Sequence, residues 1–550
     1  MLELVKRNIH MNRWKNQVGT QVTLEDDFIV PDTMGDIAQV ILDTGEIQMD
    51  PVKNLDERVQ VRGRLDFHVL YRREEGGLQT LGGLVPFEET VNVPGLTEQD
   101  YVSVSWQLED LQIDILNSRK LSIRAVVTLE VKVEALFDTE AAVELKNGSG
   151  DDDAGSGGMI SSVMERGMTG RSVMERGDEP QIEVRRKNLE VAAIALRRRD
   201  TYRVHDEITL SGTKPAIERI LWSEMRLAGT STHPLDGKIH LEGSLLIFVL
   251  YEGEGDQPVI QWVEESIPFS GEVELLGCVP EMIPVISLSL VHRGLEEKPD
   301  YDGEMRELDV DAVIELDIRL YEEKELALLD DLYATNRELI METGEAVFDR
   351  ILTHNTGKCK LAEKLPVDAG PQFLQVCHSS GTVKVDEVEV KENALLMNGV
   401  LEVRLLYLTD DDKQPIQSRI EMLPFSYEAE APGVAEESVR YLETGLEQLT
   451  AVLAGGGNVE IRAVITLDLL VLHPVNERVI LQAQLEPLDT KRLQEMPGIV
   501  GYLTQEGDSL WSIAKRFHTT VDAILSANGL SSEKIVPGDV LILVKEIVRG

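Results

Sequence analysis

The chain repeats one apolar stretch three times: GRLDFHVLY at 63–71, GSLLIFVLY at 243–251 and GVLEVRLLY at 399–407. Each copy begins with Gly, ends with Tyr and is mostly apolar between them. A short apolar run bounded by turn residues is typical of a buried β-strand. The recurrence therefore predicts three copies of one β-rich structural unit.

The residues after each copy extend the repeat. An acidic turn comes first, and a Pro-Phe pair follows at 86–87, 268–269 and 424–425. Each unit then closes with a long, β-branched apolar stretch, at 121–133, 308–320 and 459–472. Such stretches, broken by acidic or glycine turns, indicate antiparallel sheets. Because this period far exceeds a solenoid repeat, we predict three separate domains of roughly 130–150 residues.

Two further local features complete the prediction for the body of the chain. We expect a short helix before the Gly strand of each unit, near 36–42, 216–225 and 372–376. Between the first two units, residues 147–181 form a linker rich in Gly, Ser and Asp, which cannot bury a core. This linker contains SVMERG at 162–167 and again at 172–177, either a tandem duplication in a spacer or a short docking peptide.

The last fifty residues predict one compact module. Ser509 or Asp508 is a good N-cap, because its side-chain oxygen can accept a free backbone N–H of the first helical turn. Apolar residues follow at helical spacing in two stripes, and Asn528-Gly529 is a helix stop. Pro537-Gly538 is a turn before a final strand at 540–544. The expected order of elements is βααβ.

This pattern resembles the LysM domain, a small βααβ fold that usually binds N-acetylglucosamine polymers. The resemblance implies a ligand groove between the first strand–helix loop and the second helix–strand loop. The predicted groove residues are Gly507, Asp508, Ser509, Leu510, Trp511, Ala527, Asn528, Gly529, Leu530, Val536, Pro537 and Gly538. Trp511 has two interpretations, a core or groove-wall residue and an aromatic contact for a partner.

These patterns give a mainly β chain with the following expected domains. The first repeat domain covers 1–146, the linker 147–181, the second repeat domain 182–330, the third 331–486, a short linker 487–499 and the LysM-like module 500–546.

Charge and cysteine content restrict the partners and the compartment. The formal net charge of −44 argues against nucleic acid and against an anionic membrane surface. Three cysteines without CxxC spacing fit a reducing compartment, and no apolar run is long enough for a transmembrane helix. The N-terminus also lacks the apolar core of a signal peptide. We therefore expect a soluble cytosolic protein, in tension with a peptidoglycan-binding module.

Sequences that resemble catalytic or metal-binding motifs do not have the required partners. GDSL at 507–510 is followed by one histidine, His518, which has no aspartate three residues before it as in a GDSL hydrolase, and TGKC at 356–359 lacks the first glycine and the Ser/Thr of a phosphate loop. The histidines are scattered, and the acidic runs do not follow the EF-hand pattern. We predict no catalytic residue, no metal site and no cofactor, so the protein is not expected to be an enzyme.

Three Gly–apolar–Tyr repeats, each with a downstream Pro-Phe, followed by a LysM-like module resemble the SPOCS-domain proteins of endospore formers, in particular the SipL-like spore-coat assembly proteins. The resemblance implies a morphogenetic scaffold in the mother-cell cytosol, at the forespore surface. It also implies that the LysM domain docks on SpoIVA, the coat-basement ATPase, and it leaves self-association open. The alternative is a protein that binds peptidoglycan or N-acetylglucosamine in the cell wall or the spore cortex.

Overall fold

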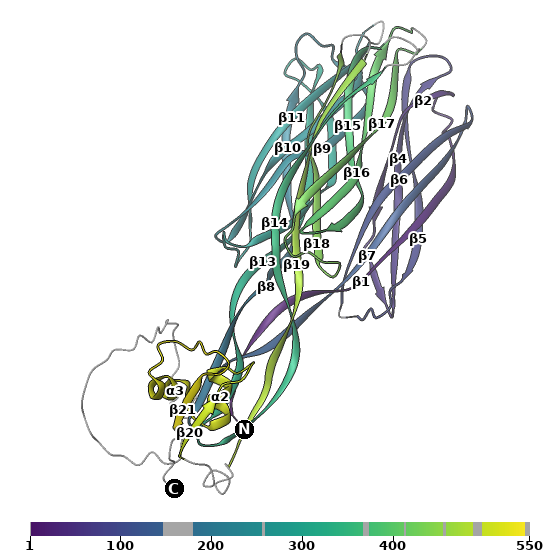
Figure 1. Ribbon diagram of the computed structural model, residues 1–550. Coiled ribbons are helices and arrows are strands. Elements are labelled where there is room, and N and C mark those ends of the chain that lie inside the picture. The colour runs from purple at the N-terminus through teal and green to yellow at the C-terminus, as the bar shows by residue number, and fades with distance from the viewer. Residues whose placement is uncertain are drawn as a thin grey trace.

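The computed structural model describes residues 2–98, 100–146, 180–255, 259–366, 373–411, 414–454, 458–487 and 498–544. Three repeated units of antiparallel sheet form most of this structure, and two short helices lie in the C-terminal module (Figure 1). The predicted mainly β fold with a βααβ module is confirmed. Most of the linker predicted at 147–181 and of the tether at 487–499 lies outside the described residues.

Unit 1 consists of two sheets, β1-β7-β6 and β2-β4-β5, with the short β3 paired to β4. Its strands are β1 (Leu4–Ile29), β2 (Ile37–Met49), β3 (Lys53–Leu55), β4 (Arg58–Arg73), β5 (Leu78–Asn92), β6 (Tyr101–Asn117) and β7 (Lys120–Leu145). The GRLDFHVLY stretch is the centre of β4, which pairs with a neighbour on both sides. That position explains why the repeated stretch is apolar.

Units 2 and 3 repeat this arrangement with sheets β12-β13-β8 and β11-β10-β9, and with sheets β14-β19-β18 and β15-β16-β17. The strands of unit 2 are β8 (Ile182–Thr209), β9 (Ile217–Leu235), β10 (Lys238–Gly253), β11 (Val259–Glu274), β12 (Ile283–Pro299) and β13 (Met305–Ala334). Those of unit 3 are β14 (Glu338–Pro366), β15 (Phe373–Lys391), β16 (Ala394–Thr409), β17 (Ile416–Glu430), β18 (Val439–Ala454) and β19 (Asn458–Glu486). Strand β13 therefore continues four residues beyond the predicted boundary at 330.

The expectation of a short helix before each Gly strand is wrong. The segments 36–42 and 216–225 and the described residues 373–376 of the third segment enter strands β2, β9 and β15, which pair with the central strand of each unit. Each pairing contains a bulge at the same place, and the extra residues Ile41, Leu221 and Cys377 are all buried. A bulge breaks the two-residue alternation of a strand, so the apolar spacing resembled that of a helix.

The Gly and Phe of the repeat form a cross-strand pair in each unit. The central strand places Gly63 opposite Phe87, Gly243 opposite Phe269 and Gly399 opposite Phe425. A Cβ atom added to Gly399 would lie 2.3 Å from the Lys384 carbonyl oxygen and 2.8 Å from the Phe425 ring. Glycine is therefore required at this position because the aromatic ring and a neighbouring backbone occupy the space of a side chain.

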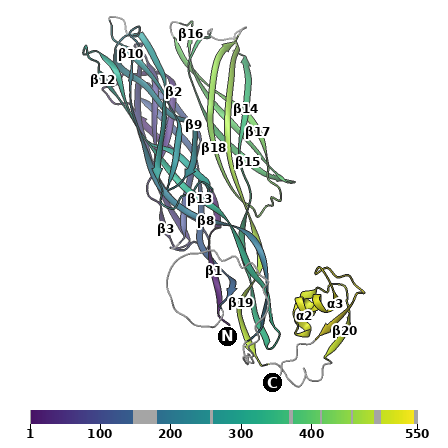
Figure 2. The same cartoon turned by 90° about the vertical axis from the view of Figure 1, so that its left-hand side faces the viewer.

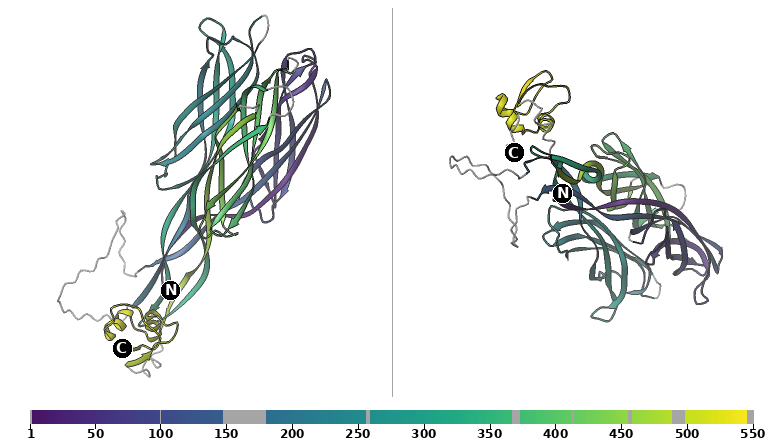
Figure 3. Two further views of the ribbon diagram at one scale, coloured as in Figure 1. Left: turned by 45° about the horizontal axis from the view of Figure 1, so that its top comes forward. Right: turned by 90° about the horizontal axis from the view of Figure 1, so that it is seen from below.

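The outer strands of each unit extend beyond its sandwich as two-stranded ribbons. The three ribbons, β1/β7, β8/β13 and β14/β19, converge into a stalk made of residues 4–11, 138–145, 182–194, 322–334, 338–348 and 475–486 (Figure 1). A buried cluster holds the ribbons together: Ile9, Met11, Ala141, Val191, Ala193, Leu326, Leu328, Phe348 and Val479. Figure 3 shows the three units spread around this stalk.

The bodies of the three units also share an apolar cluster away from the stalk. All three central strands contribute equivalent leucines, Leu70, Leu250 and Leu406. Each pair of units adds polar contacts of its own: Glu134 with Arg197 and Arg319, His378 with Glu224 and Glu264, and Arg404 with Asp43. The repeats therefore form one body in which each unit contacts the other two.

Candidate functional site

The C-terminal module lies beside the end of the stalk (Figure 2). It is built from β20 (Ile499–Leu503), α2 (Leu510–Phe517), α3 (Val521–Asn528) and β21 (Val540–Val544), and β20 pairs with β21. Ser509 is the N-cap of α2, and its hydroxyl group accepts a hydrogen bond from the backbone N–H of Ser512. Gly529 ends α3 in the left-handed conformation, in agreement with the predicted helix stop.

The structure divides the twelve predicted groove residues into an exposed set and an internal set. The loops expose Gly507, Ser509, Ala527, Gly529, Val536, Pro537 and Gly538. Two backbone hydrogen bonds join Thr504 to Gly538 and Asp539, so the first and last loops lie side by side. Leu510 is buried in the module core, Leu530 packs against that core, and Trp511 is half-buried.

The side chains of Asp508 and Asn528 make hydrogen bonds that hold the backbone near the predicted groove. The Asp508 carboxylate accepts hydrogen bonds from the Tyr502 hydroxyl group at 2.7 Å and from the Gln505 backbone N–H at 2.9 Å. The bond from Tyr502 lowers the pKa of Asp508, so its carboxylate stays ionised. The Asn528 side chain donates to the Ile542 carbonyl oxygen at 2.8 Å and accepts from the Ile542 N–H at 2.7 Å. These polar groups therefore brace the predicted groove.

A second contact region joins the module to the stalk, and sequence reasoning missed it. Trp511 Nε1 donates a hydrogen bond to Asp331 Oδ2 at 2.8 Å, and Lys515 Nζ lies 2.6 Å from Asp331 Oδ1. The Tyr333 ring packs edge-on against Trp511, with 4.9 Å between ring centroids. Asp331 and Tyr333 belong to β13 and lie about a third of the chain before Trp511, so no local pattern indicated the contact.

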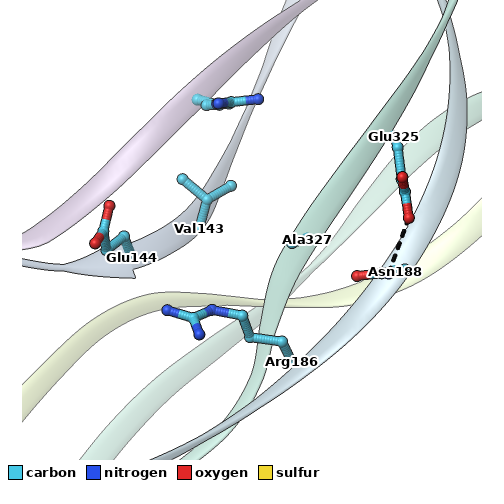
Figure 4. A pocket seen from close by; sticks show the side chains of 7 residues that line it. Val143, Glu144, Arg186, Asn188, Glu325 and Ala327 are labelled. Atoms are coloured by element: carbon cyan, nitrogen blue, oxygen red, sulfur yellow. Dashed lines mark hydrogen bonds between the residues drawn. The ribbon is translucent and has the colours of Figure 1, made fainter. Parts of the chain in front are cut away.

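Two cavities lie between units, and neither has the features of a catalytic centre. One cavity, of about 480 Å³, lies in the stalk (Figure 4). Its lining includes two positively charged side chains, Arg7 and Arg186, and two negatively charged ones, Glu144 and Glu325. The other, of about 400 Å³, lies between units 2 and 3 around His378. Among the described residues, no group of three or more His, Cys, Asp or Glu side chains is placed to hold a metal ion. Within the same residues, no helix is long and apolar enough to cross a membrane.

Three segments of the chain match the family model of the SipL SPOCS domain: 36–116, 216–293 and 372–454. Residues 502–544 match the LysM domain model. The chain carries three SPOCS domains and one LysM domain. The SPOCS domain is non-catalytic. Each SPOCS match begins at the strand with the bulge and ends before the last strand of its unit, so the ribbons that form the stalk lie outside the matches.

Matches to curated proteins are short. The chain is 52% identical over 42 residues to an uncharacterized protein of Chlamydia pneumoniae, which covers 8% of this chain and 12% of that protein. It is 49% identical over 48 residues to a probable endopeptidase p60 of Listeria monocytogenes, 9% of this chain and 10% of that protein, and this match covers only the LysM domain. It is 40% identical over 53 residues to the uncharacterized protein YkzQ of Bacillus subtilis, 10% of this chain and 71% of that protein. The chain thus spans about a tenth of the length of the first two, and no solved structure matches it.

Proposed function

We propose that this protein is a non-enzymatic scaffold that helps the coat to encase the endospore. In this proposal it works in the mother-cell cytosol at the forespore surface, and its LysM domain docks on a SpoIVA-like coat-basement ATPase. The three SPOCS domains support a role in spore-coat assembly. The domain boundaries that we propose are those predicted from the sequence, except that the second unit extends to Ala334 and the third unit starts at Thr335, because β13 reaches Ala334.

The main support for the proposal is the arrangement of the domains. The three SPOCS domains form one body, and the LysM domain lies beside the end of its stalk. Three related units with different outer surfaces can make several weak contacts at once, while the LysM domain supplies a specific one. Linked weak sites reach a high effective concentration, so modest affinities suffice to hold the protein on a surface.

The outer face of the LysM sheet supports a protein partner. The face of β20 and β21 that points away from the helices carries Ile499, Leu503, Val540, Ile542 and Val544, each between 43% and 70% exposed. Contiguous exposed apolar side chains mark interaction surfaces, and glycans offer mainly hydroxyl and amide groups. We therefore favour the ATPase over N-acetylglucosamine polymers as the main ligand.

Binding of N-acetylglucosamine polymers or peptidoglycan stays the second candidate function. The LysM match supports it, and seven predicted groove residues are exposed: Gly507, Ser509, Ala527, Gly529, Val536, Pro537 and Gly538. This groove lies on the loops of the module, whereas the apolar face lies on its strands, so the two candidates predict different effects of substitution.

A direct titration separates the two candidates. The full-length protein is titrated by calorimetry with the recombinant coat-basement ATPase of the same organism and with chitin oligomers. Ile542→Glu should weaken binding of the ATPase and leave any binding of the oligomers intact. Val259→Glu, at an exposed position of β11 remote from the module, is the matched control. Binding of the oligomers without binding of the ATPase would replace the scaffold proposal by the glycan-binding one.

A further inference from the structure

The contact between the LysM domain and the stalk is built from one short segment, Asp331-Leu332-Tyr333 of β13. Successive side chains of a strand point to opposite faces. Leu332 is fully buried in the stalk among Ala142, Ile480 and Ala483, whereas Asp331 and Tyr333 both contact the LysM domain. The segment therefore anchors itself in the stalk by its middle residue and presents an acidic and an aromatic side chain to the module.

Asp331 satisfies two donors of the LysM domain with its two oxygen atoms. Oδ2 accepts from the Trp511 indole N–H and Oδ1 from the Lys515 ammonium group, and the carboxylate side chain is only 16% exposed. Burial alone would raise the pKa of Asp331, but the bonds from Lys515 and Trp511 outweigh burial and lower it. A charged acceptor makes stronger hydrogen bonds than a neutral one, so an ionised acid is the preferred group here.

Tyr333 contributes to the hydrophobic cluster of the LysM domain itself. Its side chain is buried among Leu510, Ile513 and Ala514, and its ring packs edge-on against Trp511. Its hydroxyl group donates a hydrogen bond of 2.9 Å to the carbonyl oxygen of Thr519, at the turn between α2 and α3. The polar tip of the ring is thus satisfied, which removes the cost of burying it.

We propose that the α2 side of the LysM domain, formed by Trp511, Lys515 and Thr519, is a protein-recognition site for an extended Asp-x-Tyr segment, and that β13 occupies this site in cis. Indole and ammonium donors bind the acid, and an apolar slot that ends in a backbone carbonyl group binds the tyrosine. The site shares Trp511 with the predicted groove, but it includes neither the exposed groove residues nor the apolar face of the sheet. It fixes the LysM domain on the stalk and leaves those two surfaces uncovered.

The chain contains a second Asp-x-Tyr sequence, at 200–202, which serves other contacts. Asp200 pairs with Arg198, and the Tyr202 ring packs against Phe269. The sequence alone is therefore insufficient, and the segment must lie on an accessible strand. An external protein can use the same site only by displacing the β13 segment with similar chemistry.

The first test uses the full-length protein labelled with 5-fluorotryptophan. Its five tryptophans give separate ¹⁹F signals, and Trp511→Phe identifies that of Trp511. Tyr333→Phe keeps the ring and removes only the hydroxyl group, and Asp331→Ala removes the acceptor of the indole. Both should shift the Trp511 signal towards that of a solvent-exposed indole. Glu325→Gln, at an exposed position of the same strand whose carboxylate accepts a hydrogen bond from Asn188, should leave it unchanged. An unchanged Trp511 signal in both variants would refute the cis contact.

The second test asks whether the site recognises the segment rather than merely touching it. A synthetic peptide of residues 328–334 is titrated into the wild-type protein and into the Asp331→Ala variant. We expect binding about tenfold tighter to the variant, because the β13 segment occupies the site in the wild type. The control is the same peptide with Ala in place of Asp331 and Tyr333. Equal binding of both peptides, or no binding, would reject recognition. Neither test involves the ATPase or a glycan, so failure here would leave the proposed function standing.

Discussion

The imidazole ring of His378 in unit 3 stacks on the phenyl ring of Phe248 in unit 2, with 3.9 Å between ring centroids and 11° between ring planes. Its nitrogen atoms lie 3.1 Å from a carboxylate oxygen of Glu264 and 3.3 Å from one of Glu224, both in unit 2. Only 8% of His378 is exposed. One side chain therefore combines apolar packing and charge at the contact between two units.

Stability at the contact between units 2 and 3 should depend on pH. Burial lowers the pKa of His378, but the hydrogen bonds and charges of Glu224 and Glu264 outweigh burial and raise it above 6.5. Since the folded pKa is raised, the stabilisation is complete below 6.5 and is lost as pH rises through the folded value. Arg226 and Glu265 also line this site, and the Arg226 guanidinium keeps its charge throughout this range. We expect His378→Gln to lower the melting temperature more below pH 6.5 than in alkaline buffer, where the variant loses only the packing against Phe248.

His68→Gln provides the control for this pH effect. His68 lies at the position of β4 equivalent to Phe248 and is exposed. Its substitution should leave the melting temperature of the protein unchanged across the same pH range. Equal effects of His378→Gln at both pH values would contradict the charge assigned to His378.

Glu134 should be one of the most sensitive charged residues of the body. Its carboxylate is 1% exposed and lies 2.6 Å from Arg197 and 3.2 Å from Arg319, so it joins units 1 and 2. Removing one partner of a buried ion pair leaves the others uncompensated and costs about 3–5 kcal/mol. Glu134→Ala should lower the free energy of unfolding by that amount in a denaturant titration. Glu130→Ala, on the same strand but more exposed, should cost about 1 kcal/mol or less.

The glycine of the repeat should not tolerate even a methyl group. In Gly399→Ala the new Cβ atom would lie 2.3 Å from a backbone oxygen, which cannot move without disturbing β15. Overpacking of this kind costs about 1–3 kcal/mol. Thermal unfolding should therefore begin at a lower temperature in this variant. Gly212→Ala, where nothing lies within 4 Å of the added atom, should unfold as the wild type does.

Replacing Asn528 should lower the stability of the LysM domain. Asn528→Ala removes both side-chain bonds to Ile542 and leaves backbone groups of β21 without partners, at a cost of about 1–3 kcal/mol. Amide hydrogen exchange at 540–544 should accelerate in the full-length variant, while exchange in the SPOCS strands stays unchanged. Ser526→Ala, at an exposed position of the same helix, should alter neither. Unchanged exchange at 540–544 would show that Asn528 does not hold β21.

The three repeated units could be predicted from the sequence, but the β-bulges within their strands could not. Repeated Gly, Tyr and Pro-Phe positions revealed three antiparallel units, because these residues have the same packing role in each copy. The bulges at Ile41, Leu221 and Cys377 could not be recognised, since one extra buried residue makes a strand look helical in a pattern of apolar spacing. The stalk was also missed, because an extended strand carries no signal for where it leaves its own sheet.

In the candidate site, only the features that depend on neighbouring residues in the sequence could be predicted. Ser509, Gly529 and Pro537 act through neighbouring residues, so capping and turn chemistry placed them correctly. The partners of Trp511 could not be predicted, because Asp331 and Tyr333 reach it only after the ribbon of unit 2 has extended into the stalk. Contacts between distant strands depend on tertiary geometry, which spacing along one chain does not contain.

The covalent connection of the three units has a consequence for the interfaces between them. A homotrimer of single units would use the same side chain at each of its three interfaces, and one substitution would change all of them. Here the equivalent position of the central strand is held by His68, which is exposed, by Phe248, which stacks on His378, and by Arg404, which pairs with Asp43. Because the three units belong to one chain, each interface can carry its own side chains, and the similar cores do not require three identical outer surfaces.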